Sequence, residues 1–174
     1  MNFTFEVLPE ERIECLRESC NKLMAFQKSV ASIRPELFDT MNFETRLLPS
    51  MEKAIHNYTV VVKNNDEIIG YVYSNISPKD TYSNEFATFF DVTSVNKPYV
   101  GCLSQFYIKE GFRKYRIGSR LFSMSLDWLK EFDEIEDIFI FVSNGNSNAL
   151  EFYKRKGFNI SHDILDGFIT VLRN

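Results

Sequence analysis

The sequence predicts a mixed α/β fold built on one sheet, and three observations carry this prediction. Apolar residues recur at helical spacing in some segments, and alternate or run continuously in others. A strand, a helix and a fully apolar strand follow one another between residues 103 and 142, an order typical of a parallel crossover unit. The chain has 174 residues and no linker, repeat or low-complexity tract. We therefore expect one domain that spans residues 1–174.

The N-terminal third is predicted to hold a strand and two helices. Residues 3–7 alternate in character, as a short strand does. A second helix is expected to start at Pro35 and to end before Pro49. Between these elements Pro9 opens a charged segment that reads as a long amphipathic helix, because its apolar residues recur at helical spacing: Ile13, Leu16, Cys20, Leu23, Met24 and Val30.

The middle of the chain predicts a hairpin followed by an insertion. Residues 58–63 and 68–73 are strand-like and are joined by residues that tolerate left-handed backbone. An aromatic-rich insertion at about 74–99 follows, and long ordered insertions are often functional. It either walls a binding pocket, or is a packed elaboration or a homodimer contact. We expect a short helix capped by Ser77-Pro78, with four aromatic residues on one face: Tyr82, Phe86, Phe89 and Phe90.

The C-terminal part predicts alternating strands and helices. Strand 103–108 precedes a third helix, and 138–142 is a strand buried on both faces. A fourth helix is expected to end at Gly157. Two last strands, 158–163 and 167–172, are joined around an Asp-Gly turn. The third helix is predicted from the helical spacing of Ile117, Leu121, Met124, Trp128 and Phe132. The fourth is predicted from the stripe of Ala149, Phe152 and Tyr153.

Composition excludes several classes of protein. The formal charge of −4 argues against nucleic acid as the partner and fits a cationic substrate better. The cysteines, Cys15, Cys20 and Cys102, have no metal-site spacing, so we expect reduced core thiols and no metal. No signal peptide and no membrane span are seen, which predicts a cytoplasmic protein without a membrane partner. Aromatic residues make up 15%, more than a plain core requires, so some are expected to line a pocket or interface.

A basic loop between strand 103–108 and the third helix is the first candidate binding motif. A helix N-terminus presents unpaired N–H groups and a positive dipole end, which suit a pyrophosphate. Gly118 would let backbone approach the ligand, and the loop supplies charge from Arg113, Lys114, Arg116 and Arg120. The Gly-Lys-Ser/Thr ending of a nucleotide triphosphatase is absent. A solvated basic helix start remains the alternative.

Residues 146–158 form the second motif, and the two motifs together resemble the GNAT superfamily of acyltransferases. The superfamily's later helix commonly reads Asn-x-x-Ala-x-x-x-Tyr-x-x-x-Gly-Phe. Asn146, Ala149, Tyr153, Gly157 and Phe158 match it in register. Its coenzyme signature is Arg/Gln-x-x-Gly-x-Gly/Ala. Here Arg113, Gly118 and Ser119 match, whereas Arg116 replaces the first Gly, a substitution that ordinary helical backbone would tolerate.

The resemblance implies a GNAT-like fold, with a mixed and mostly antiparallel sheet, a splayed parallel strand pair and about four to five helices. It implies that the cosubstrate acetyl-CoA lies between the splayed strands, that backbone near Tyr107 and Ile108 polarises the thioester, and that the acetyl group passes to a primary amine by direct attack in a ternary complex. The coenzyme-binding residues would be Phe106, Tyr107, Ile108, Arg113, Lys114, Arg116, Ile117, Gly118, Ser119, Asn146, Ala149, Phe152 and Tyr153.

Tyr153 is the candidate catalytic side chain, since a phenol can protonate the departing thiolate. Its alternative role is that of a core aromatic residue on the apolar stripe. No general base is assigned. Ser104 stands where many relatives have a carboxylate, and Glu85, Asp91 and Glu110 could act through water. His56 and His162 are expected to be structural.

The acceptor stays open at this point. An aromatic-lined pocket in acidic surroundings would suit the amine of a small molecule. The alternatives are a protein amine, from a lysine or an N-terminus, and an acyl-CoA-binding sensor that has lost turnover, which the missing carboxylate at Ser104 would favour.

Overall fold

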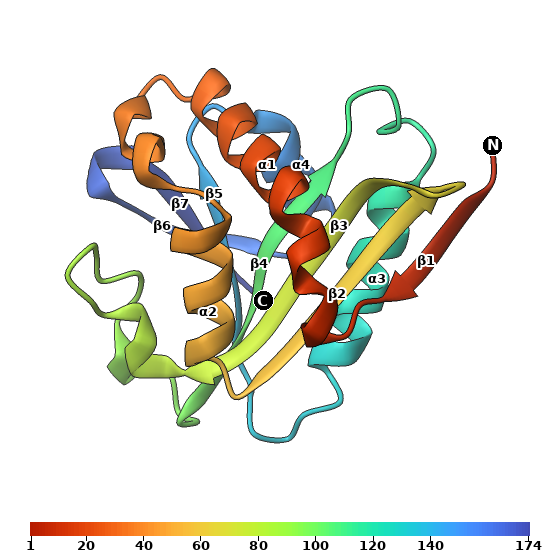
Figure 1. Cartoon of the computed structure of the whole chain (residues 1–174). Helices are drawn as coiled ribbons and strands as arrows, with labels where there is room; N and C mark the ends of the chain where they lie inside the picture. The colour runs from red at the N-terminus through yellow and green to blue at the C-terminus, as the bar shows by residue number, and fades with distance from the viewer.

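The computed structural model describes residues 1–174, which form one seven-stranded sheet in the order β1-β2-β3-β4-β5-β7-β6 (Figure 1). Neighbouring strands run antiparallel except β4 and β5, which are parallel as the sequence predicts. The strands are β1 (Phe3–Val7), β2 (His56–Asn64), β3 (Glu67–Pro78), β4 (Tyr99–Ile108), β5 (Ile138–Ser143), β6 (Asn159–Ile164) and β7 (Ile169–Arg173).

Helices cover both faces of this sheet. The N-terminal helices pack on one face around a core that includes Leu16, Cys20 and Phe43. Helices α3 and α4 cover the other face around Leu121, Phe122 and Tyr153. The longer helices are α1 (Arg17–Val30), α2 (Leu48–Lys53), α3 (Ile117–Leu129) and α4 (Ser147–Arg155), and the short ones are η1 (Glu10–Leu16), η2 (Pro35–Thr40), η3 (Phe43–Leu47), η4 (Lys79–Tyr82), η5 (Val92–Ser94) and η6 (Leu165–Gly167). No helix is of the length and apolarity that crossing a membrane requires.

The N-terminal helices differ in detail from the prediction. The expected single helix begins with the 3₁₀ turn η1 before α1. The expected second helix is broken into η2, the π-helical turn η3 and α2. Pro49 lies in the first turn of α2 instead of ending a helix. The reason is that the first turn of a helix leaves its N–H groups unpaired, so proline loses nothing there.

The insertion contains no capped α-helix, and that prediction was wrong. Residues Ser74–Pro78 extend β3, and Pro78 precedes the 3₁₀ turn η4 without a side-chain cap. The aromatic rings pack individually on β5: Phe90 stacks on Phe139 with ring centroids 4.0 Å apart, and Tyr82 lies 5.5 Å from Phe141. Tyr82, Phe89 and Phe90 thus contact the sheet directly, and Phe86 packs only on Phe89, so helical spacing is not required.

The hairpin β2–β3 and the end of α4 follow the prediction closely. The hairpin β2–β3 turns at Asn65, which has a φ of 55°. Helix α4 ends at Gly157 with a φ of 96°, and the N–H groups of Gly157 and Phe158 bond the carbonyls of Lys154 and Tyr153. This is the Schellman arrangement, in which glycine relieves the strain of left-handed backbone.

Candidate functional site

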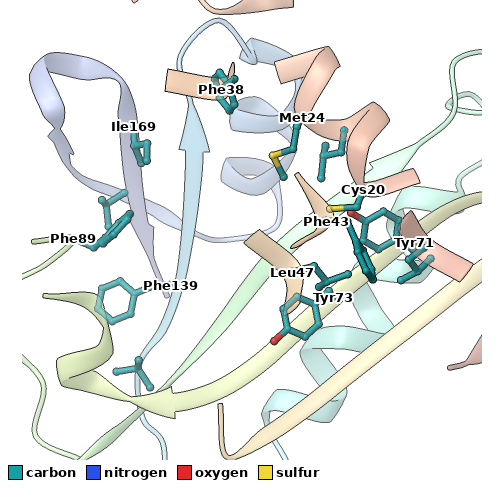
Figure 2. Close-up of a cluster of buried hydrophobic side chains, with 14 of the residues drawn as sticks. Cys20, Met24, Phe38, Phe43, Leu47, Tyr71, Tyr73, Phe89, Phe139 and Ile169 are labelled. Carbon is teal, nitrogen blue, oxygen red and sulfur yellow. The ribbon is translucent and has the colours of Figure 1, made fainter. Parts of the chain in front are cut away.

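A cavity of about 630 Å³ lies where β4 and β5 diverge. The two strands pair only from Gly101 to Leu103 on β4 and from Ile138 to Ile140 on β5. Beyond these pairs the inner edge of each strand opens on the cavity, since β3 and β7 occupy the outer edges. Figure 2 shows side chains that line it converging from α1, η2, the insertion and β7: Met24, Phe38, Phe89 and Ile169.

One end of the cavity, here named the loop end, is formed by the last residues of β4, the basic loop and the starts of α3 and α4. Arg113 is held across the cavity wall: its guanidinium lies 4.7 Å from the ring centre of Phe26 on α1, and its Nε donates to the Ile108 carbonyl at 3.0 Å. Lys114, Arg116 and Arg155 also line this end. The buried Ser143 hydroxyl at the end of β5 has no hydrogen-bond partner and lines the same cavity.

Arg116 does not have the ordinary helical backbone that the sequence led us to expect. It is the N-cap of α3, with a φ of 60° and a ψ of 16°, in the left-handed region. A side chain there costs about 1–2 kcal/mol, a cost that glycine avoids. The first glycine of the coenzyme signature therefore serves this backbone conformation, and the present chain carries a cation at some expense in stability.

Replacing Arg116 by glycine is expected to leave the melting temperature unchanged or to raise it, because relief of strain offsets glycine's entropy of about 0.5–1 kcal/mol. Coenzyme A affinity should fall about three- to tenfold with the loss of one cation. Thermal melting and calorimetry measure the two effects. The control is Lys114→Gly, which removes the same charge without relieving strain and should melt lower. A lower melting temperature for Arg116→Gly would contradict this account.

The cavity brings together all of the predicted coenzyme-binding residues except Ile117. Ile117 is 2% exposed and packs in the core between α3 and the sheet. Its side chain cannot reach a ligand, so only its backbone is available. Gly118 lines the cavity, and a Cβ there would lie 3.3 Å from Ile108. Glycine at this position thus also lets α3 approach β4.

Tyr153 lies on α4 and faces the cavity from the α3 side of the sheet. Its ring packs edge-on against Phe106 with centroids 6.3 Å apart. The hydroxyl forms no hydrogen bond within the chain, and burial raises the pKa of the phenol above its ordinary value near 10. The ring is part of the core, 6% exposed, while the hydroxyl lies beside the cavity without a partner, and the catalytic role of Tyr153 stays a prediction.

No carboxylate considered as a general base lines the cavity. Glu85, Asp91 and Glu110 are exposed and lie outside it, and Asp91 caps η5 by accepting from the Thr93 N–H at 2.9 Å. Ser104 lines the cavity and is the extra residue of a bulge, since Tyr73 pairs with Gln105 and Ser74 with Leu103.

Both histidines have structural surroundings. His56 stacks on Phe132, with ring centroids 4.7 Å apart, and the Nε2 of His162 lies 2.9 Å from the Phe89 carbonyl oxygen. Neither lines the cavity. No group of three or more His, Cys, Asp or Glu side chains is arranged to hold a metal ion.

The opposite end of the cavity, here named the insertion end, contains residues that the sequence did not single out. Short helices η2, η3 and α2, the end of β3, the insertion and β7 enclose it. The aromatic insertion contributes as anticipated, but the polar residues from η3 and α2 were missed, because no motif marks them. Its lining includes Phe38, Met41, Arg46, Lys53, Asn75, Ser77, Tyr82, Asn84, Phe86, Phe89, Phe168 and Ile169.

The charge of the cavity is opposite to the acidic surroundings that the sequence led us to expect. Its walls hold no Asp, Glu or His. None of the basic side chains that line it forms an ion pair, although ten ion pairs occur elsewhere in the chain. The net charge of −4 resides on the outer surface and does not describe the cavity. These unpaired cations are Arg46, Lys53, Arg113, Lys114, Arg116 and Arg155.

Solved structures of similar shape contain coenzyme A or acetyl-CoA. The PaiA N-acetyltransferase of Thermoplasma acidophilum in complex with coenzyme A has a TM-score of 0.70 at 16% identity, over 100% of this chain and 99% of that chain. Arabidopsis thaliana NAA60 in complex with acetyl-CoA has a TM-score of 0.63 at 14% identity, over 99% and 98%. The NatC complex bound to Gag peptide and CoA has a TM-score of 0.61 at 14% identity, over 99% and 96%.

These likenesses confirm the predicted fold. No curated protein matches the chain. The family model described as the acetyltransferase (GNAT) family matches residues 23–158, which include both sequence motifs and nearly the whole cavity wall. The chain therefore belongs to the GNAT family of acetyltransferases.

Proposed function

We propose that the protein is an N-acetyltransferase that moves the acetyl group of acetyl-CoA to the primary amine of a small molecule by direct attack in a ternary complex. One observation carries the proposal. A single cavity joins an unpaired basic loop, two open strand edges and the free hydroxyl of Tyr153 to the insertion end.

The loop end fits the chemistry of coenzyme A. Cations without acidic partners suit phosphates, and the N–H groups at the start of α3 add to them. The open edges of β4 and β5 offer backbone partners to the amide groups of the pantetheine arm. Backbone N–H groups near Tyr107 and Ile108 would then hold the oxyanion of the tetrahedral intermediate, a contribution of about 3 kcal/mol where such a donor is removed.

Tyr153 would donate its hydroxyl proton toward the sulfur of the leaving thiolate. A phenol with a raised pKa is a weaker acid than a thiol, so complete transfer is uphill unless the phenolate is reprotonated. The proton that the attacking nitrogen loses can restore the phenol. In the net reaction the nitrogen forms the amide bond, the thioester bond breaks, and one proton moves from nitrogen to sulfur.

Amine deprotonation needs no carboxylate in this cavity. The acceptor attacks as the neutral amine, and no acidic residue of the cavity stabilises its ammonium form. Water can take the proton before attack. This accounts for a family member in which Ser104 replaces the carboxylate, and it removes the main support for a coenzyme-binding sensor without turnover.

A small acceptor is favoured over a protein amine because the packed insertion forms one wall of the insertion end. Tyr82 packs on Phe89, Phe90 and Phe141, which fixes the insertion against β5 beside the cavity. A protein amine remains the second candidate, since one similar structure holds a bound peptide. The free cysteines Cys15, Cys20 and Cys102 support a cytoplasmic location for this reaction.

Acetyl-CoA is expected to stabilise the folded protein. A ligand that binds only the native state at about a hundred times its dissociation constant adds roughly 2.7 kcal/mol, which raises the melting temperature by several degrees. Thermal melting with acetyl-CoA, coenzyme A and dephospho-coenzyme A measures this. The dephospho form should stabilise less, since it lacks a phosphate for the basic loop. If millimolar acetyl-CoA leaves the melting temperature of the folded protein unchanged, the cosubstrate assignment is overturned.

A further inference from the structure

Arg46 is a cation of the cavity that lies away from the proposed coenzyme site. It lies on η3 and lines the insertion end of the cavity. Its electrostatic neighbours are Cys102 of β4, Cys20 of α1 and Tyr82 of the insertion. Cys102 precedes Ile108 by six residues along β4, a distance of roughly 20 Å at 3.3 Å per residue. Arg46 is thus far from the basic loop.

The guanidinium of Arg46 has no partner in the chain. It forms neither an ion pair nor a side-chain hydrogen bond, and no acidic residue lines the cavity. Its side chain retains exposed surface, yet burial lowers the pKa of the guanidinium from its ordinary value. The guanidinium lines the cavity and is accessible from it, so it is free to pair with an anionic ligand.

Several interactions fix the helical turn that carries Arg46. Phe43 and Leu47 are fully buried, and Figure 2 shows them packed beside Cys20, Tyr71 and Tyr73. The Asn42 and Thr45 side chains form a capping box. Asn21 of α1 accepts from the Phe43 N–H at 2.9 Å, and Arg17 forms an ion pair with Glu44. The backbone that carries Arg46 is therefore held in place before any ligand arrives.

The insertion end also connects Arg46 to the reaction centre. Cys102 is an electrostatic neighbour of both Arg46 and Tyr153. Apart from Lys53, the walls of the insertion end are apolar or neutral, with Phe38, Met41 and Phe168 beside Asn75 and Ser77. A short acceptor could therefore reach from the guanidinium to the thioester and bury an apolar group on the way.

We propose that Arg46 binds the carboxylate of the acceptor, so that the acceptor is a small molecule carrying both a primary amine and a carboxylate, such as an apolar amino acid. This rests on the proposed acetyltransferase function. The planar guanidinium matches a carboxylate in a bidentate pair. The apolar residues beside Arg46 suit the side chain of an amino acid, and the phosphonate comparison below tests the carboxylate against a doubly charged group.

The experiment compares acceptors that differ only in the charged group, using the full chain and acetyl-CoA. Leucine, phenylalanine and methionine are assayed against their amides by release of free thiol. The amides hold less basic amines and more free base, so amine availability favours them. We expect kcat/KM to be higher for the acids by about 10- to 100-fold, as for a lost charge-assisted hydrogen bond. Aminoethylphosphonate against β-alanine tests phosphonate in place of carboxylate.

Variants then assign the preference to Arg46. Arg46→Gln should abolish the preference for acids and leave the amides nearly unchanged, and Arg46→Lys should restore part of it. Acetyl-CoA affinity by calorimetry should stay the same. The melting temperature should not fall, because the cation removed has no partner. Lys130→Gln is the matched control, since Lys130 is exposed at the C-cap of α3 and lies outside the cavity.

Equal rates for acids and amides, a preference for the phosphonate, or a preference that survives Arg46→Gln would each overturn this inference while leaving the acetyltransferase function standing. If no amine is acetylated, the proposed function fails. The inference is then decided by calorimetry of N-acetyl-leucine with the coenzyme A complex. Binding that wild type shows and Arg46→Gln loses supports it, and equal or absent binding overturns it.

Discussion

Replacing Tyr153 by phenylalanine is expected to lower turnover by about 10²-fold or more, the usual cost of a lost general acid. The hydroxyl forms no hydrogen bond within the chain, so its loss leaves no partner unpaired. The ring keeps its packing against Phe106 and Phe122 at 6.3 and 6.2 Å. Stability and coenzyme affinity should therefore stay close to those of wild type. Thiol release in single-turnover experiments with saturating acetyl-CoA measures the chemical step.

Tyr58→Phe is the matched control for that substitution. Tyr58 stacks on Trp128, with ring centroids 5.0 Å apart, and lies outside the cavity. Its substitution should change neither turnover nor affinity. Burial raises the pKa of the Tyr153 phenol above its ordinary value near 10, so the phenol stays protonated at every pH up to about 10. Deprotonation of Tyr153 should therefore not lower the wild-type rate in that pH range. A Tyr153→Phe protein with full turnover would reduce Tyr153 to a packing role.

The parts of the site that lie on one local pattern were predictable from the sequence. The strand, helix and buried strand from 103 to 142 carry their own periodicity, and the parallel pairing of β4 with β5 follows from the length of the crossover. Tyr153 and Gly157 are placed by the register of α4 and by its C-terminal cap, both of which depend on neighbouring residues alone.

Arg46 could not be predicted in this way. It sits on a π-helical turn of five residues between two other short helices, so the apolar spacing around it matches no single period. Its neighbours Cys20, Tyr82 and Cys102 are distant in sequence and meet it only in the folded chain. The positive charge of the cavity could not be predicted from the sequence either. Net charge sums over the whole surface, whereas the cavity selects cations from four separate segments.

The left-handed backbone conformation of Arg116 could not be predicted from the sequence either. A basic residue before a helix predicts an ordinary first turn, and nothing in the charge pattern marks a left-handed φ of 60°. The insertion shows the converse. Its aromatic spacing indicated a helix, but Asn84 accepts from the Phe86 and Ala87 N–H groups and turns the chain instead.

Replacing Gly145 by alanine is expected to cost several kcal/mol of folding free energy, the largest stability effect in the chain. A Cβ at Gly145 would lie 1.8 Å from the Val30 carbonyl oxygen, and its φ is 82°. The neighbouring Asn144 side chain accepts from the Ser32 and Ile33 N–H groups at 2.8 Å each. The loop between β5 and α4 is thereby fastened to the end of α1. Alanine must break this junction, since two backbones meet there and neither can move alone.

Gly157→Ala separates the two causes of that loss. Gly157 has a similar φ of 96°, but a Cβ there would meet no atom within 4 Å. It should cost only the strain of left-handed backbone, about 1–2 kcal/mol, or roughly 2–8 °C in melting temperature. The excess loss in Gly145→Ala, measured by urea unfolding of both variants, is then the steric cost of the junction. Similar losses in the two variants would show that α1 and the loop yield easily. In that case the junction would not fix α1, which lines the cavity with Leu23, Met24 and Phe26, against the loop between β5 and α4.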